Sequence, residues 1–326
     1  AALDAALVMA RREVKFPASE VAATRLAIIG MGKAGARELN YVSDVDVIFV
    51  AESGSDELSD DRTVTIATQL AMQTMRAIHG VGREPGLWEV DANLRPEGKD
   101  GALVRTLESH LAYYDRWAKS WEFQALLKAR PLAGDVELGQ RYVDALAPKV
   151  WSSASRENFV ESVQRMRERV TENIPPDELG VQLKLGPGGL RDVEFTIQLL
   201  QLVHGQTDQN VRQTATLSAL TALAEHGYIG RVEAAEFSGD YRFLRLLEHR
   251  LQLSRLRRTH IMPTDREQLR ILARASGLAA TADDLTAKWM RTKQTVRTLH
   301  ERLFYRPLLS AVAALPDDGL HLSSEQ

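Results

Sequence analysis

Residues 26–50 constrain the fold of this chain more than any other stretch. Two apolar runs, residues 26–29 and 45–50, flank a turn that contains Gly30, Gly32 and Gly35. Short apolar runs rich in β-branched residues are typical of buried strands. The glycines allow main-chain N–H groups to approach a bound phosphate closely. The stretch therefore predicts two strands joined by a turn that is suited to a phosphoryl group.

The second run opens with Ser43, Asp44, Val45 and Asp46. In a strand, side chains two residues apart point to the same side, so Asp44 and Asp46 aim two carboxylates at one place. Like charges at short range repel each other and raise a pKa unless a cation lies between them. Asp-x-Asp pairs are common at solvated strand ends, but beside a glycine turn their oxygens suit Mg²⁺ that carries substrate phosphates.

The order of strand, glycine turn and Ser-Asp-x-Asp strand resembles the catalytic centre of the nucleotidyltransferase superfamily. Residues 30–46, GMGKAGARELNYVSDVD, are similar to one family, the bifunctional glutamine synthetase adenylyltransferase/adenylyl-removing enzymes, which carry two such halves in one chain. The resemblance extends roughly over residues 25–315. It also rests on residues 90–96 (VDANLRP), 121–131 (WEFQALLKARP) and 184–195 (KLGPGGLRDVEF).

This resemblance implies an α+β chain. A nucleotidyltransferase-fold domain with a small mixed β-sheet and flanking helices would be followed by an all-α helical bundle. We expect a helical connector at residues 1–24, the catalytic domain at 25–134, the bundle at 135–315 and a flexible tail at 316–326. The chain does not begin with methionine, which suggests a fragment of a longer protein.

A third carboxylate, Asp91, ends a predicted strand at residues 87–91. Nucleotidyl transfer commonly uses two metal ions about 3.5–4 Å apart, and three carboxylates from adjacent strands suit that arrangement. The alternative role for Asp91 is to cap the loop that follows. The family usually has a basic residue at the position of Asn93, so Arg95 is the more dependable cation of this segment.

The sequence and its resemblance together predict two sets of site residues. The metal, Mg²⁺ or Mn²⁺, is expected on Asp44, Asp46 and Asp91. The expected phosphate and nucleotide contacts are Gly30, Gly32, Lys33, Gly35, Ser43, Arg95, Lys184, Arg191 and Glu194. The last three flank the glycine-rich residues 186–189, where a helix begins and its N–H groups favour anions. Ordinary capping of that helix is the alternative.

Helical periodicity predicts helices over residues 59–79, 106–118 and 120–130, and no strand after residue 135. Residues 190–204 are apolar nearly all round, which predicts a buried helix. Three aromatic residues have the spacing of core positions: Tyr114, Trp117 and Trp121.

Basic residues gather in two predicted helices. Residues 240–258 direct leucines inward and carry six arginines, which are Arg242, Arg245, Arg250, Arg255, Arg257 and Arg258. Such a run is usually a solvated face, and the alternative is a dock for an acidic protein surface or a phosphorylated substrate. Lys128 and Arg130 either complement the dipole at the end of helix 120–130 or reach a substrate phosphate.

The two halves of the family catalyse opposite reactions. One uses ATP to attach AMP to a tyrosine of glutamine synthetase, and the other removes AMP by phosphorolysis to give ADP. Residues 185–205, 244–252 and 259–263 resemble the N-terminal, adenylyl-removing half. The resemblance thus implies a metal-dependent nucleotidyltransferase with adenylylated glutamine synthetase, phosphate and ATP or ADP as partners, and the PII signal protein as regulator. The adenylylating half and a catalytically silent binding module are the alternatives.

Composition excludes several other classes of protein. The chain has 41 basic and 44 acidic residues and a formal net charge of −3, which argues against a nucleic-acid partner. No apolar run reaches the length of about 18 residues that a membrane span requires. The chain has no cysteine, so disulfides and thiolate metal sites are excluded. A cytoplasmic location fits these features.

Overall fold

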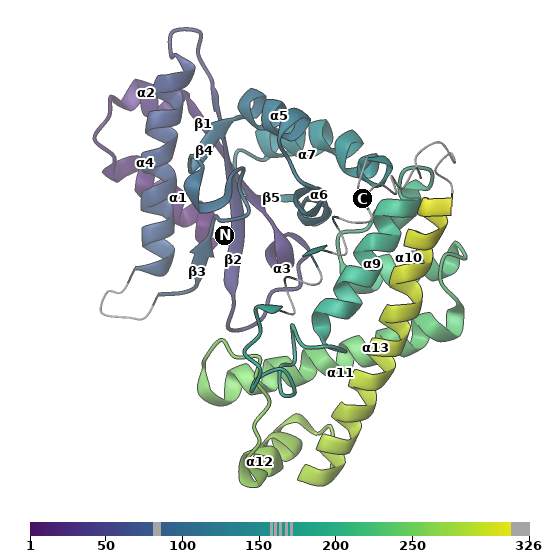
Figure 1. Ribbon diagram of the computed structural model, residues 1–326. Helices are drawn as coiled ribbons and strands as arrows, with labels where there is room; N and C mark the ends of the chain where they lie inside the picture. Colours follow the sequence, from purple (N-terminus) through teal and green to yellow (C-terminus); the bar gives the residue numbers. More distant parts are fainter. Residues whose placement is uncertain are drawn as a thin grey trace, which may run out of the picture. The chain divides into compact units, whose positions relative to one another are not determined.

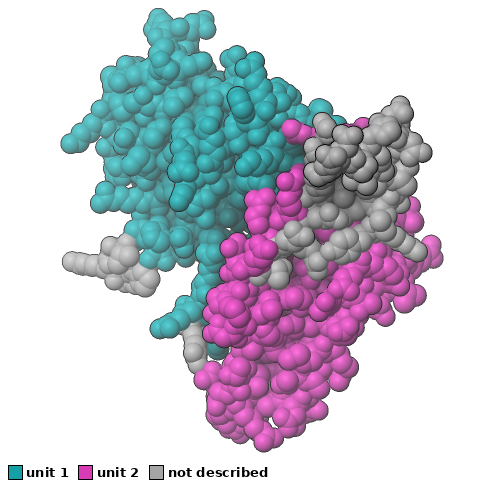
Figure 2. All heavy atoms as spheres, in the orientation of Figure 1, with its two compact units in different colours: residues 1–153, 212–219, 252–259 teal, residues 154–211, 220–251, 260–326 magenta. Residues whose placement is uncertain are grey.

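The computed structural model describes residues 1–80, 86–156 and 172–313, together with residues 159, 162, 165, 166 and 169. The chain divides into two compact units, coloured separately in Figure 2, and neither unit is one continuous stretch. The first consists of residues 1–153, 212–219 and 252–259, and the second of residues 154–211, 220–251 and 260–326. The predicted tail, residues 316–326, lies outside the described residues.

A five-stranded mixed sheet forms the centre of the first unit, as the α+β prediction expected (Figure 1). Its order is β3-β2-β1-β5, and β4 also pairs with β2. The long β2 is antiparallel to β1 and parallel to β3 and β4, while β5 is antiparallel to β1. The strands are β1 (Thr24–Gly30), β2 (Asp44–Ser53), β3 (Glu89–Asp91), β4 (Val104–Thr106) and β5 (Arg130–Gly134).

One strand of this sheet falls where the sequence predicted the end of a helix. The helix expected over residues 120–130 is α6 (Ser120–Leu126), and residues 130–134 pair with β1 as strand β5. Periodicity alone could not separate these elements because the apolar positions of 126–133 suit either one. The free edge of β1 decides in favour of a strand, since pairing satisfies its main-chain N–H and C=O groups.

Helices cover both faces of the sheet. Val47 and Phe49 of β2 belong to an apolar cluster with α1 (Ala2–Glu13) and α4 (Asp60–His79). On the opposite face Ile48 pairs in register with Ile29, and α7 (Val136–Trp151) packs there. Both of these isoleucines are fully buried. Because both faces are covered, β2 reads as a continuous apolar run rather than an alternating one.

The remaining helices of the first unit are short. They are α2 (Ala18–Ala23), α3 (Gly32–Gly35), α5 (Leu107–Arg116) and α6, with a 3₁₀ turn at Gly98–Asp100. The helix predicted over residues 59–79 is confirmed as α4, and Ser59 caps it by accepting a hydrogen bond from the N–H of Arg62. The core assignment is right for Tyr114 but wrong for Trp117, which is 72% exposed just after α5 ends, and for Trp121, which is 36% exposed.

The described elements of the second unit are helices and 3₁₀ turns joined by loops, apart from an isolated bridge between Gln182 and Ile261. The predicted buried helix is α9 (Leu190–His204), which packs against α13 (Ala282–Ala313). The arginine-rich helix is α11 (Arg231–Arg255), which starts earlier than predicted and ends three residues sooner. The other elements are α10 (Thr216–Glu225), α12 (Arg266–Ser276) and 3₁₀ turns at Ser153–Ser155 and Gln209–Val211. None of the described helices has both the length and the hydrophobicity needed to cross a bilayer.

Candidate metal centre

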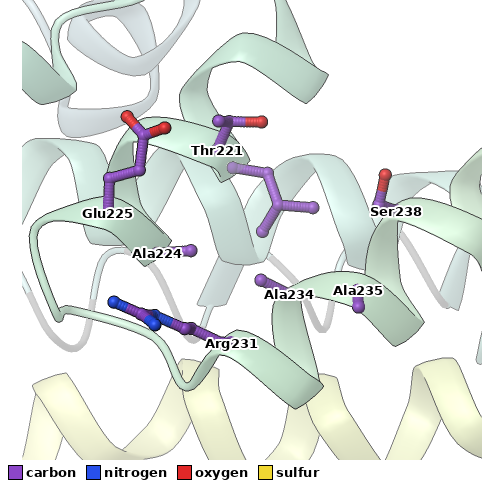
Figure 3. Close-up of a pocket in the computed structure, with 8 residues that line it drawn as sticks. Thr221, Ala224, Glu225, Arg231, Ala234, Ala235 and Ser238 are labelled. Carbon is purple, nitrogen blue, oxygen red and sulfur yellow. The ribbon is translucent and has the colours of Figure 1, made fainter.

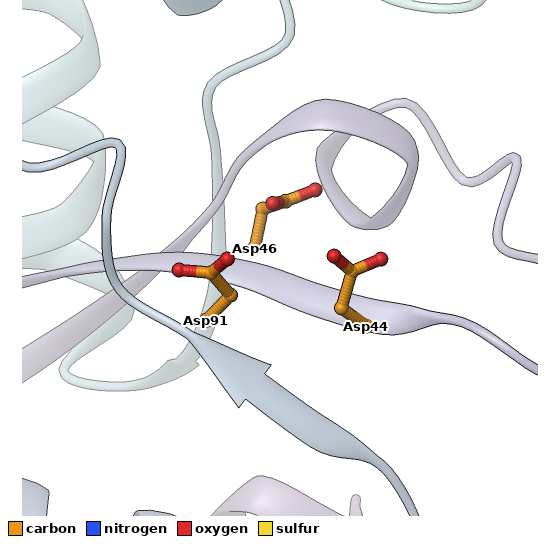
Figure 4. A group of neighbouring side chains, drawn as sticks. All are labelled: Asp44, Asp46 and Asp91. Atoms are coloured by element: carbon orange, nitrogen blue, oxygen red, sulfur yellow. The ribbon is translucent and has the colours of Figure 1, made fainter. Parts of the chain in front are cut away.

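Three carboxylates meet at the N-terminal end of β2 (Figure 4). Asp46 lies directly opposite Asp91 in the parallel register of β2 and β3, and Asp44 lies two residues before Asp46 on the same side of its strand. One oxygen from each of the three carboxylates lies within 4.8 Å of the others. Sequence spacing predicted the first pair, and the strand register adds Asp91 to it.

Hydrogen bonds orient two of these carboxylates. The hydroxyl of Ser43 donates to Asp44 Oδ1 at 3.3 Å. The main-chain N–H of Asn93 donates to Asp91 Oδ1 at 2.7 Å. Asp91 therefore caps the loop after β3, as the alternative interpretation held, and one of its oxygens also lies within 4.8 Å of oxygens of Asp44 and Asp46. At the position where the family usually has a base, Asn93 contributes its backbone, and its side chain is exposed.

The glycine turn packs directly against the carboxylates. The N–H of Met31 donates to the carbonyl oxygen of Asp46 at 2.9 Å. Gly32 has a φ of +49°, and a Cβ there would lie 2.5 Å from Asp46 Oδ2. A Cβ on Gly35 would lie only 1.8 Å from the carbonyl oxygen of Lys128. Glycine is required at both positions, at Gly32 so that the turn can approach the carboxylate itself.

The other predicted residues of the turn also lie beside the centre. Gly30 is the last residue of β1, and a Cβ there would lie 3.1 Å from Leu132 Cδ2. Lys33 is the second residue of α3, directly after Gly32, and is partly exposed. The structure thus brings together Gly30, Gly32, Lys33, Gly35, Ser43, Asp44, Asp46 and Asp91.

The donor set fits a divalent cation. Two unit negative charges 4 Å apart repel by about 1 kcal/mol in water and about 4 kcal/mol near a protein surface. Three such charges converge here, and they come from rigid sheet positions that cannot move apart without breaking strand pairing. Carboxylate oxygens are the ligands that Mg²⁺ and Mn²⁺ prefer. Asp44, Asp46 and Asp91 would hold the ion.

Arg95 does not turn its side chain to a phosphate site. Its Nε donates to the carbonyl of Gly101 at 3.0 Å, Nη1 to Ala92 at 2.9 Å and Nη2 to Lys99 at 3.0 Å. Burial lowers the pKa of this guanidinium, although the nearby Asp91 opposes the shift. All three nitrogens hold together the loop between β3 and β4. Arg95 thus shapes the loop after Asp91 in this structure, and its predicted contact with phosphate stays a prediction.

Lys128 and Arg130 also hold the first unit together. Lys128 is 7% exposed, and its Nζ lies 3.1 Å from Glu38 Oε2 and 3.1 Å from Thr216 Oγ1. Arg130 donates from Nε to the carbonyl of Gly35 and from Nη2 to that of Ala34. These carbonyls end the helical turn after Gly32, so Arg130 fixes the glycine turn rather than reaching a phosphate.

Three predicted contacts lie in the second unit. Lys184 and Arg191 are partly buried, and the Arg191 guanidinium lies over the Phe195 ring, 4.9 Å from its centroid. Glu194 is 9% exposed and accepts a hydrogen bond from the hydroxyl of Tyr241 at 3.4 Å. The capping function offered as the alternative belongs to Asp192, whose Oδ2 accepts the N–H of Gly188 at 2.7 Å.

Known proteins resemble the chain over its whole length. It is 71% identical to the bifunctional glutamine synthetase adenylyltransferase/adenylyl-removing enzyme of Leifsonia xyli subsp. xyli, with 100% of the chain aligned to 33% of that relative. The enzymes of the same name from Streptomyces avermitilis and Cutibacterium acnes are 57% and 51% identical, and each alignment covers 99% of the chain and 32% of the relative. The chain belongs to this family.

Two family models divide the chain. Residues 1–145 match glutamate-ammonia ligase adenylyltransferase, and residues 157–304 match GlnD PII-uridylyltransferase. The first match contains the sheet and the three carboxylates, and the second contains α9 to α12 and most of α13. The chain spans about a third of the length of the curated relatives it matches. This part of the family's sequence therefore includes one complete carboxylate cluster.

Two residues at the centre, Glu89 and Arg258, were not predicted as site residues from the sequence. Glu89 is the register partner of Asp44 and lies two residues before Asp91, so it repeats the spacing of the Asp44–Asp46 pair. That repeat, Glu-x-Asp beside Asp-x-Asp, was a signal that could have found it. Arg258 Nη1 lies 3.0 Å from Asp44 Oδ2 and 3.8 Å from Glu89 Oε2. The sequence offered Arg258 only as one of six arginines in a basic run.

Two hollows lie elsewhere in the described residues. One of about 380 Å³ lies between α10 and α11 in the second unit, with Glu225 and Arg231 on its walls (Figure 3). Another of about 190 Å³ lies in the first unit beside α6 and α7 and is lined mainly by apolar residues. Neither is lined by a site residue predicted from the sequence, and the carboxylate cluster remains the candidate functional site.

Proposed function

We propose that this chain is the adenylyl-removing half of its family. It would remove AMP from adenylylated glutamine synthetase by phosphorolysis, giving unmodified synthetase and ADP. The observation that carries the chemistry is the convergence of Asp44, Asp46 and Asp91 beside a glycine turn. Phosphoryl transfer needs positioning and charge stabilisation more than covalent help from the protein, and this arrangement offers both.

The reaction balances without a dedicated general base. An oxygen of hydrogen phosphate forms a bond to the AMP phosphorus, the bond from that phosphorus to the tyrosine oxygen breaks, and the phosphate proton goes to the tyrosine. Asp44, Asp46 and Asp91 would hold a divalent cation, which would supply charge neutralisation for the phosphoryl oxygens. Gly32 keeps the turn close to Asp46, and Lys33 follows it on α3 as the predicted phosphate contact.

The direction of the reaction rests on the resemblance of residues 185–205, 244–252 and 259–263 to the adenylyl-removing half. The adenylylating half is the second candidate, because the model matched by residues 1–145 is described as an adenylyltransferase and the relatives' name carries both activities. The catalytic core suits either direction because both transfer the same AMP group. Regulation by the PII signal protein and a cytoplasmic location are parts of the same proposal.

Enzyme assays with the two forms of glutamine synthetase test the function. We expect the chain to release ADP from adenylylated synthetase when orthophosphate and Mg²⁺ are supplied, and not to label unmodified synthetase from ATP labelled in its AMP moiety. Incorporation of label would reverse the proposed direction. The double variant Asp44→Asn, Asp46→Asn should lose both Mn²⁺ binding and ADP release while its circular dichroism is unchanged.

A matched control makes the same change of charge beyond the opposite end of β2. Asp56 and Glu57 are exposed residues in the turn just after β2. The double variant Asp56→Asn, Glu57→Gln should therefore keep Mn²⁺ binding and ADP release within about twofold of the original chain, since exposed charges contribute little. Retained turnover in the Asp44, Asp46 variant would refute the metal role of these carboxylates.

A further inference from the structure

Arg258 reaches the carboxylate centre from a distant part of the sequence. Its Nη1 lies 3.0 Å from Asp44 Oδ2 and 3.8 Å from Glu89 Oε2, so one guanidinium nitrogen bridges β2 and β3 at the mouth of the cluster. Residues 252–259, which include Arg258, belong to the first unit although the rest of α11 before them belongs to the second. The contact therefore lies within one compact unit.

The end of α11 has a defined turn that leads to this arginine. Leu256 adopts a left-handed conformation with a φ of +47°, and the N–H of Arg257 donates to the carbonyl of Gln252 at 3.2 Å. This pattern is a Schellman turn, in which glycine is the usual left-handed residue. Leucine in that conformation is strained because its Cβ crowds the following carbonyl, and its side chain is 73% exposed. The turn redirects the chain within two residues of Arg258.

Three other cations near the glycine turn and the Asp91 loop have internal partners. Arg95 and Arg130 donate to backbone carbonyls, and Lys128 is paired with Glu38. Arg258 differs from them because its partner is one of the proposed metal ligands. Its side chain is 46% exposed, and ion pairs this exposed contribute little because solvent and salt screen them. The pairing is therefore weak enough to be exchanged.

We propose that Arg258 is a substrate-phosphate contact of this centre. Its ion pair with Asp44 keeps the guanidinium beside the centre until a metal binds. When Asp44 binds a divalent cation, the guanidinium loses its nearer carboxylate partner and keeps only the longer contact with Glu89, at 3.8 Å. Its planar set of donors then suits two oxygens of a phosphate, a bidentate geometry that lysine cannot reproduce. The ligand is a phosphate oxyanion, either orthophosphate or the phosphates of a nucleotide. This inference rests on the proposed function, because it requires a metal at Asp44.

Opposite effects on two affinities test the proposal. In the full chain without phosphate, Arg258→Ala should bind Mn²⁺ about fivefold more tightly, because the variant lacks a cation that competes for Asp44. In the Mn²⁺-loaded protein the same variant should bind phosphate about tenfold more weakly or worse, because a charge-assisted bidentate contact is lost. Calorimetry with orthophosphate and with ADP distinguishes the two sources of the oxyanion: a loss for either one supports the contact and names its ligand.

Two further variants separate this role from a surface ion pair. Arg258→Lys keeps the positive charge but not the bidentate donor geometry of the guanidinium. Mn²⁺ affinity should therefore stay near that of the original chain while phosphate affinity falls. Arg257→Ala removes an exposed neighbouring arginine and should change neither affinity. Unchanged or weaker Mn²⁺ binding in Arg258→Ala, or unchanged affinity for both phosphate and ADP, would overturn the inference alone. Failure of the original chain to bind Mn²⁺ would overturn the proposed function and this inference together.

Discussion

The two units treat their acidic residues in opposite ways. In the first unit Asp44, Asp46 and Asp91 gather within 4.8 Å of one another at the end of a sheet. In the second unit the buried Glu248 lies 2.5 Å from Arg245 Nη1 and 3.0 Å from His260 Nδ1, and its side chain has no exposure to solvent. A fully buried carboxylate between two internal partners has a structural role, whereas three converging carboxylates, of which Asp44 pairs with the half-exposed Arg258, indicate a site for an external cation.

The largest effect expected from this comparison is on stability. Glu248→Ala leaves Arg245 and His260 without their common partner, so the free energy of unfolding should fall by about 3–5 kcal/mol. Urea unfolding measures this loss, and calorimetry should show unchanged Mn²⁺ affinity. Glu236 is an exposed glutamate of the same helix, and Glu236→Ala should change stability by less than about 0.5 kcal/mol. Equal losses of unfolding free energy in the two variants would contradict the structural role of Glu248.

A smaller effect is expected at the glycine turn, and it should combine stability with metal binding. Gly32→Ala puts a Cβ into a left-handed backbone 2.5 Å from Asp46 Oδ2, which should cost about 1–2 kcal/mol and weaken Mn²⁺ binding. Thermal melting and calorimetry measure the two losses.

The control for Gly32 is a glycine without neighbours. Gly239 is an exposed residue of α11, and a Cβ there would meet no atom within 4 Å. Gly239→Ala should therefore stabilise the protein by about 0.5–1 kcal/mol, because alanine loses less backbone entropy in a helix. If Gly32→Ala also stabilised the protein and left Mn²⁺ affinity unchanged, the close approach of the turn to Asp46 would not matter to the site.

The smallest expected effect concerns a carboxylate that breaks the pattern of the second unit. Asp240 accepts a hydrogen bond from Thr292, but burial raises its pKa to about 6. Its folded-state pKa is above the value of about 3.9 in an unfolded chain, so the protonated group favours folding at low pH and this contribution is lost as pH rises through 6.

Asp240→Asn should therefore raise the melting temperature by about 2 °C at pH 7.5 and leave it unchanged at pH 4. Asp283 pairs with Arg266 on the surface, and Asp283→Asn should give no such pH-dependent gain. A gain of equal size at both pH values would show that the substitution acts through packing rather than through the charge of Asp240.

Local pattern was sufficient for the parts of the centre that depend on neighbours in sequence. The two-residue spacing of Asp44 and Asp46 in a strand and the glycine turn before them follow from backbone geometry. The N-cap of α4 at Ser59 and the burial of α9 follow from capping chemistry and helical periodicity. Strand β5 was missed because its residues suit either element locally and only the open edge of β1 selects a strand.

The sequence by itself determined that an Asp-x-Asp pair would lie on one side of a strand beside a glycine turn, because strand alternation and glycine's freedom at positive φ act over a few residues, and the α+β class came from the family resemblance. Only the tertiary structure decided which cationic side chains are paired inside the protein and which lie beside the carboxylates. The sequence predicted Arg95 as a phosphate contact and offered that role to Lys128 and Arg130 as one of two alternatives. Arg95 and Arg130 donate to backbone carbonyls, and Lys128 contacts Glu38. Arg258 lies at Asp44 through the turn after α11. Side-chain pairing across long sequence distances depends on how strands and helix ends are packed, which local pattern does not encode.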